Sequence, residues 1–104
     1  MRSEVVVSFG PTQQFTIPVT PGDAMDSQTA RRWLDEQFVA NDCAPLRASG
    51  KVLTADKVLA LAQTVGPARF ADDPAFAHGY AHAAAGALGR PTVVVDAEEG
   101  AVTF

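Results

Sequence analysis

Apolar and polar residues alternate at both ends of the chain, a pattern that is typical of half-buried β-strands. Four segments show this alternation: 4–9, 15–19, 92–96 and 101–104. Short stretches rich in glycine, proline and acidic residues join them into two hairpins. If the apolar side chains of each hairpin point to one face of the sheet, Phe9 lies opposite Phe15 in the first hairpin and Val95 lies opposite Val102 in the second.

Between the hairpins, apolar residues recur at the three- or four-residue spacing of amphipathic helices. We expect three helices, at residues 27–40, 55–65 and 74–88. The third has the clearest ends, because Asp73 and Pro74 suit a helix start and Gly89 suits a helix end. Gly66 and Pro67 should stop the second helix.

These elements predict one α+β domain over residues 1–104, in the order ββαααββ. In the simplest arrangement the two hairpins join into a four-stranded, mostly antiparallel sheet, and the three helices cover one of its faces as a second layer. The strand order stays open. Gly79 and Gly86 lie inside the third helix, where glycine costs about 1 kcal/mol relative to alanine. Their presence suggests that a neighbouring element approaches this helix closely.

Composition and charge narrow the classes of function. The net charge is −4 and there is no basic run, which argues against nucleic acid as a partner. No apolar run approaches the roughly 18 residues of a membrane-spanning helix, and the first residues make a poor signal peptide. The single cysteine, Cys43, excludes an internal disulfide framework. We therefore expect a cytoplasmic protein that binds neither nucleic acid nor membrane.

His78 and His82 are four residues apart in the third predicted helix, a spacing that can present two imidazoles to one metal ion. The glutamate of a zinc-protease helix is missing, and the sequence places no third ligand nearby. A helix that buries Phe76 and Tyr80 turns both histidines toward solvent. We therefore expect no metal and no other cofactor, with the histidine pair as the weaker alternative.

No catalytic residue is predicted, because no carboxylate is marked as paired and no positive charge adjoins Cys43 to activate its thiol. The alternative is a small enzyme or small-molecule-binding domain with a pocket near Trp33, Tyr80 and the 41–53 loop. Arg47 and Lys51 of this loop could bind a phosphate or carboxylate. The favoured interpretation places Trp33 in the core and both cations on an ordinary surface.

The leading functional hypothesis is a non-catalytic protein-interaction or regulatory module. The hairpin registers that bury one face of the sheet also determine which residues point the other way. That second face carries its charges mainly at the strand ends, and its candidate interface residues are Val6, Thr16, Val94 and Thr103. We expect this face to form a homodimer or to dock a protein partner.

Overall fold

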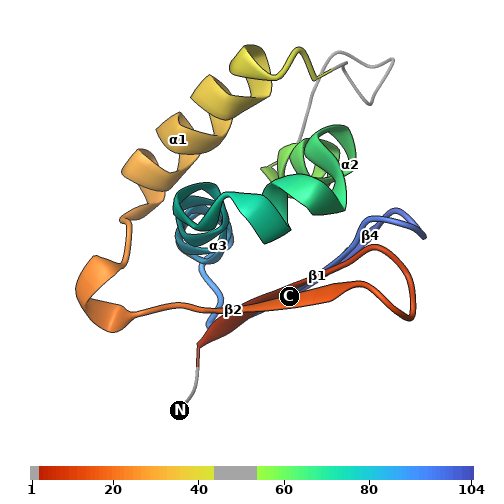
Figure 1. Ribbon diagram of the computed structural model, residues 1–104. Coiled ribbons are helices and arrows are strands. Elements are labelled where there is room, and N and C mark those ends of the chain that lie inside the picture. The colour runs from red at the N-terminus through yellow and green to blue at the C-terminus, as the bar shows by residue number, and fades with distance from the viewer. Residues whose placement is uncertain (1–2, 44–53) are drawn as a thin grey trace.

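The computed structural model describes residues 3–43 and 54–104. Its elements run in the order β1 (Glu4–Ser8), β2 (Gln14–Pro18), the 3-10 helix η1 (Pro21–Asp23), α1 (Ser27–Ala40), α2 (Thr54–Asp72), α3 (Pro74–Leu88), β3 (Thr92–Asp96) and β4 (Ala101–Thr103). The predicted α+β fold and its order ββαααββ are confirmed. The three helices lie on one side of the sheet; α2 and α3 are next to it, and α1 packs across their far side (Figure 1).

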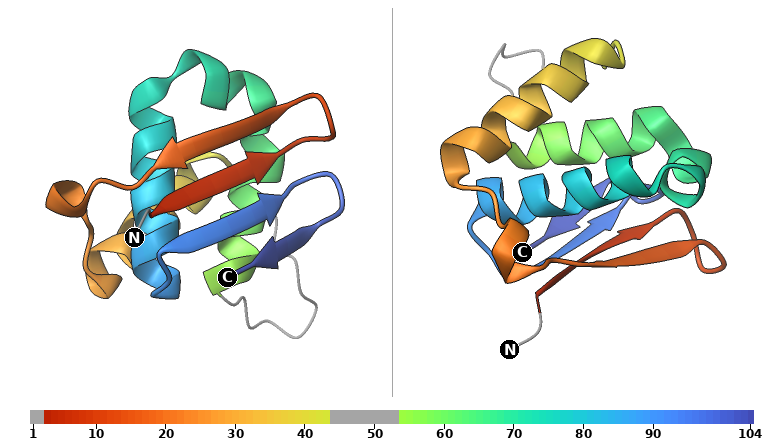
Figure 2. Two further views of the ribbon diagram at one scale, coloured as in Figure 1. Left: turned by 90° about the horizontal axis from the view of Figure 1, so that it is seen from below. Right: turned by 60° about the vertical axis from the view of Figure 1, so that its left-hand side comes forward.

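The strands form one sheet in the order β2-β1-β3-β4 (Figure 2). Both hairpins are antiparallel, but their inner strands are parallel, with Val5 beside Val93 and Val7 beside Val95. The sheet is therefore mixed, and the prediction of a mostly antiparallel sheet is wrong in this respect. The apolar pattern of each hairpin indicates how its own two strands pair. It does not indicate whether the inner strands of the two hairpins, β1 and β3, run parallel or antiparallel.

The first hairpin is shifted by two residues from the predicted register. Phe15 faces Val7, whereas the apolar pattern placed it opposite Phe9. The Phe9 amide donates to the Gln13 carbonyl at 2.8 Å, so the loop of this hairpin is two residues shorter than the predicted register requires. Because side chains alternate with a period of two, this shift leaves every apolar residue on its predicted face. The second hairpin has the predicted register.

The second helix continues past its predicted end. α2 bends at Gly66, which has a φ of 77°, and becomes helical again from Pro67. Proline ends one helical segment but also fits the first turn of the next, where an amide hydrogen is not needed. The added segment carries Phe70 into an aromatic cluster, where its ring centroid lies 5.1 Å from that of Tyr80 and 5.5 Å from that of Phe76.

Helix α3 lies between the sheet and α1 and is buried on several sides (Figure 2). Its alanines and aromatic residues pack with the inward-facing valines of β1 and β3. On the side of α1, two glycines allow close contact. A Cβ atom at Gly79 would lie 2.8 Å from the Trp33 ring, and one at Gly86 would lie 2.5 Å from the Met25 carbonyl oxygen. The close approach predicted at these glycines is confirmed.

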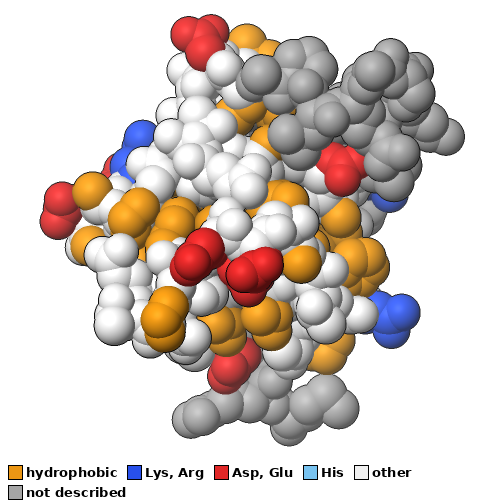
Figure 3. Space-filling model, turned by 90° about the vertical axis from the view of Figure 1, so that its right-hand side faces the viewer, with side chains coloured by type: hydrophobic (Ala, Val, Ile, Leu, Met, Phe, Trp, Pro, Cys, Tyr) orange, Lys and Arg blue, Asp and Glu red, His pale blue; other side chains and the backbone are white. Residues whose placement is uncertain are grey.

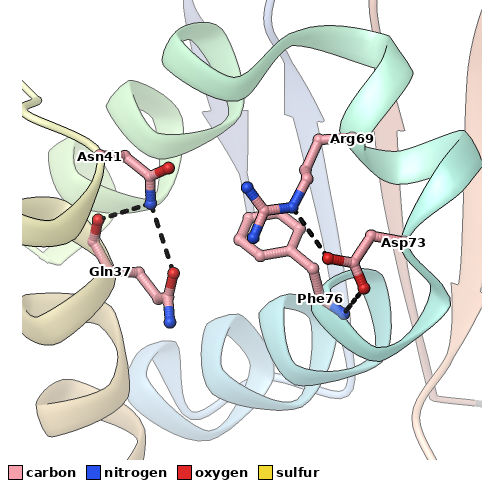
Figure 4. Close-up of polar contacts among 5 residues, drawn as sticks. All are labelled: Gln37, Asn41, Arg69, Asp73 and Phe76. Atoms are coloured by element: carbon pink, nitrogen blue, oxygen red, sulfur yellow. Dashed lines mark hydrogen bonds and ion pairs between the residues drawn. The ribbon is translucent and has the colours of Figure 1, made fainter.

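Aspartates cap the starts of α1 and α3. Asp26 accepts a hydrogen bond from the Thr29 amide at 2.7 Å, and Asp73 accepts one from the Phe76 amide at 3.1 Å. Asp73 also accepts from Nε of Arg69, whose guanidinium group lies over the Phe76 ring (Figure 4). The pKa of both carboxyl groups is lowered, mainly because they accept hydrogen bonds from backbone amides.

We predict that Gly86→Ala destabilises the protein, although alanine favours helices by about 1 kcal/mol. The new methyl group would meet a backbone oxygen that cannot rotate away. Overpacking costs about 1–3 kcal/mol, and contact with a rigid backbone oxygen favours the upper half of this range. After the gain in helix propensity, we expect a net loss of about 1–2 kcal/mol in the free energy of unfolding, measured in urea. In the control, Trp33→Phe should relieve the clash of Gly79→Ala but not that of Gly86→Ala. A Gly86→Ala protein as stable as the wild type would contradict this packing.

We predict that Asp73→Asn lowers stability at neutral pH but not in acid, although asparagine also caps helices. The pKa of Asp73 is lowered in the folded protein, so its ionised form stabilises the fold above the unfolded value of 3.8. This contribution is lost as the pH falls through the lower, folded value. The difference in Tm between wild type and variant should therefore shrink in acid, whereas Asp72→Asn should show a smaller difference at neutral pH. A difference that is independent of pH would contradict the role of the carboxylate.

Candidate functional site

No helix covers one face of the sheet (Figure 2). On this face, the strand register aligns a row of uncharged side chains across all four strands. The register places Thr16 beside Val6, Val6 beside Val94, and Val94 beside Thr103. Val94 is 37% exposed, and Val6 is partly exposed. We call these four residues the valine row. They are the positions that the sequence predicted for an interface.

Acidic side chains border the valine row and do not interrupt it. On the open face, the next row toward one end of the strands contains Glu4, which pairs with Thr92. The next row toward the other end contains Asp96, which pairs with Ser8. Further acidic residues lie in the turn between β3 and β4, where Glu98 and its neighbour Glu99 are exposed. Acidic side chains are visible on one side of the molecule in Figure 3. The open face therefore has an uncharged centre and an acidic border.

His82 is buried, so the prediction that both histidines face solvent is wrong for this residue. It is 1% exposed, whereas the His78 side chain is 50% exposed. The Thr20 amide donates to Nε2 of His82 at 3.0 Å, so Nδ1 carries the proton and donates to the His78 carbonyl at 2.8 Å. The segment that follows β2 covers this side of α3, and the pattern of the helix itself does not indicate such a cover.

Asp23, in η1, lies close to both histidines. Its Oδ2 atom is 3.7 Å from Nε2 of His78, and the rings of His78 and His82 stack with their centroids 3.9 Å apart. One possible ligand atom from each residue lies within 4.8 Å of the other two. We call these three residues the His–Asp cluster. The fold thus supplies the third potential ligand that the sequence did not place.

Trp33 and Tyr80 both make packing contacts. The Trp33 ring lies against Gly79 and beside the Phe76 ring. Tyr80 is fully buried, and its hydroxyl donates to the Val58 carbonyl at 2.6 Å. Burial raises the pKa of this hydroxyl, which stays protonated and bonded within the core. Tyr80 therefore offers no free polar group to a ligand.

The remaining residues predicted from the sequence add little to a site. Arg47 and Lys51 lie outside the described residues, and so does the 41–53 loop beyond its first three positions. Cys43 is a buried free thiol. Buried structural thiols are typically unreactive.

A groove that the sequence did not indicate lies between β2 and the junction of α2 and α3. It has a volume of about 510 Å³, and its walls include Phe15 and Ile17 of β2 and Phe70 of α2. Thr20 and His78 also line it. β2 is an edge strand, so its outer backbone groups have no partner strand in the sheet. Finding the groove requires knowing that β2 is an edge and that α2 continues past Pro67.

Comparison with known proteins found no matching protein-family model, no matching curated protein and no matching solved structure. Among the described helices, none is long and apolar enough to cross a membrane. The open sheet face, the His–Asp cluster and the groove are therefore the features from which a function can be inferred.

We predict that His82→Ala loosens the segment that follows β2. The Thr20 amide loses its acceptor and a buried space opens, so the free energy of unfolding should fall by about 2–3 kcal/mol. Urea unfolding measures the loss, and amide exchange at Thr20 should become faster. The control is His78→Ala, whose exposed side chain should contribute much less. Unchanged exchange at Thr20 would show that His82 does not hold this segment.

Proposed function

We propose that this chain is a non-catalytic protein-interaction module of the cytoplasm that forms a homodimer through its open sheet face. The observation that carries the proposal is the valine row, which has two valines side by side at its centre and a threonine at each end. A fully solvated sheet face usually carries polar residues at these positions. The single cysteine suits a reducing compartment.

The valine row is symmetric, because from either edge of the sheet its order is threonine, valine, valine, threonine. In an isologous dimer, a two-fold axis relates the two copies of one surface. If this axis runs along the strands, Val6 of one copy meets Val94 of the other; if it runs across them, each valine meets its own copy. In both cases threonine meets threonine. A second copy of the chain therefore complements the row in either symmetric arrangement.

The acidic border also tolerates this symmetry. With the axis along the strands, Glu4 faces Thr92 and Asp96 faces Ser8 of the other copy. With the axis across the strands, Glu4 faces Ser8 and Asp96 faces Thr92. Each carboxylate thus meets a hydroxyl, which can donate a hydrogen bond to it, and not another carboxylate. For Glu4 and Asp96, face-to-face association therefore places no like charges directly opposite one another.

The size of the face indicates how strong such a dimer would be. Strands lie about 4.8 Å apart and rise about 3.3 Å per residue, so four short strands cover an area of roughly 14 by 16 Å. This is less than half of the roughly 800 Å² per partner that stable interfaces bury. The proposed dimer is therefore weak and depends on protein concentration, as transient complexes do.

Small-molecule binding is a second candidate function, and the groove beside β2 favours it. Its volume of about 510 Å³ falls within the usual range for ligand pockets, which is about 300–1,000 Å³. Its lining combines aromatic and aliphatic walls with a few polar groups, among them Gln14, Thr16 and His78. This location differs from the pocket near Trp33 and Tyr80 that the sequence suggested. Native mass spectrometry of the purified protein would reveal a retained ligand.

We predict that Val6→Glu combined with Val94→Glu abolishes self-association. The double variant puts two negative charges into the centre of each face, and burying like charges against each other is costly. Sedimentation velocity over a range of protein concentrations is the measurement. The sedimentation coefficient of the wild type should rise with concentration, whereas that of the variant should stay at the monomer value.

Two further variants serve as controls. Val39, on α1, is 74% exposed, so Val39→Glu adds the same charge at another exposed valine and should leave the dimer intact. Val6→Thr with Val94→Thr keeps the β-branched shape and should weaken the dimer only partly. Circular dichroism establishes that each variant is folded. A wild type that remains monomeric at every concentration, or a folded glutamate variant that associates like the wild type, would contradict the proposal.

A further inference from the structure

We infer that the His–Asp cluster, formed by Asp23, His78 and His82, is a binding site for a divalent transition-metal ion such as Zn²⁺. Two imidazoles and one carboxylate form a ligand set that zinc sites use. Imidazole nitrogen favours zinc, copper and nickel, whereas magnesium and calcium prefer sites built from oxygen alone. The chemistry of the three side chains therefore selects a transition metal.

His82 is oriented as a metal ligand should be. A ligating histidine usually donates its second ring N–H to a carbonyl or carboxylate, which fixes the ring and leaves the other nitrogen free to bind. Nδ1 of His82 makes this bond to the His78 carbonyl at 2.8 Å, so Nε2 carries the lone pair. Burial of the ring restricts its rotation. One ligand of the site is therefore held in place before a metal arrives.

The two other ligands can move into position. Tetrahedral Zn²⁺ with bonds of about 2.0–2.1 Å requires ligand atoms roughly 3.3 Å apart. In the His–Asp cluster they lie within 4.8 Å of one another, and the distance between Asp23 Oδ2 and His78 Nε2 is 3.7 Å. The side chain of Asp23 is 59% exposed and that of His78 is 50% exposed, so small rotations can bring the ligand atoms closer together. A fourth position is left for water.

The Thr20 amide competes with a metal ion for His82, and it can also report metal binding. Its amide occupies the lone pair of His82 Nε2, at 3.0 Å, and a metal must displace it. Thr20 is exposed, so water can satisfy the released amide. Metal binding should therefore change the environment of the Thr20 amide strongly, while amides of the open sheet face should change little.

The test is a titration of tag-free, chelator-treated protein with ZnCl₂ in a calorimeter, repeated with CoCl₂, whose visible absorption reports tetrahedral coordination. The wild type should bind one zinc ion per chain. His78→Ala and Asp23→Asn should each weaken binding by about tenfold or more, since even changes outside the ligand set cost about 10–100-fold. Magnesium should not bind. The Thr20 amide resonance should shift in the wild type during the titration.

The control is Glu36→Gln, which removes an exposed carboxylate on α1 and should leave zinc affinity unchanged. Val6→Glu with Val94→Glu should bind zinc like the wild type, so a failed dimer proposal would not affect this test. His82→Ala adds support only if the variant is folded, and the two exposed ligands decide the question without it. Absence of zinc binding, or equal affinity in the wild type and His78→Ala, would overturn the inference.

Discussion

The fold depends on the close approach of α1 to α3. Trp33 lies over Gly79, and Gly86 lies under Met25 and Ala30, at distances that leave no room for a Cβ atom. On its other sides α3 packs against the sheet and α2 through small and aromatic side chains. Because one helix makes all of these contacts, its small residues set the spacing of the layers on both sides. An enlarged residue on α3 would push α1 outward or lift the helix from the sheet.

Features that belong to one element can be predicted from the sequence. The start of α3 follows from Asp73 and Pro74, and its end follows from Gly89, which has the left-handed conformation that a helix end favours. Features that depend on how elements meet cannot be predicted in this way. Nothing local indicates that β1 and β3 pair in parallel, or that His82 lies under the segment that follows β2. Pro67 misled the prediction for α2, because proline can either end a helix or begin one.

The candidate sites divide in the same way. The period of two along each strand is sufficient to place Val6 and Val94 on the open face. Only the pairing of β1 with β3 makes them neighbours and turns isolated valines into a continuous row. The His–Asp cluster could be predicted only in part, because the spacing of the histidines is visible but Asp23 comes from η1, far away along the chain. The two-residue shift of the first hairpin keeps Thr16 on its predicted face. It also brings Thr16 beside Val6, where the predicted register would have placed Pro18.

The segment that follows β2 links the groove with the His–Asp cluster, because Thr20 lines the groove and Asp23 lies three residues further along. This segment begins where the edge strand β2 ends. Its Thr20 amide donates a hydrogen bond to His82, and further along it Asp23 lies beside the two histidines. His82 Nε2 cannot bind both the amide and a metal, so any metal bound there must loosen the segment from α3. Thr20 also lines the groove, so this change would reach the groove directly. The open face lies on the side of the sheet away from the helices (Figure 2), whereas Thr20 contacts α3 through His82. The proposed dimer and the proposed metal site therefore depend on different residues: the valine row on the open face of the sheet, and the His–Asp cluster of η1 and α3.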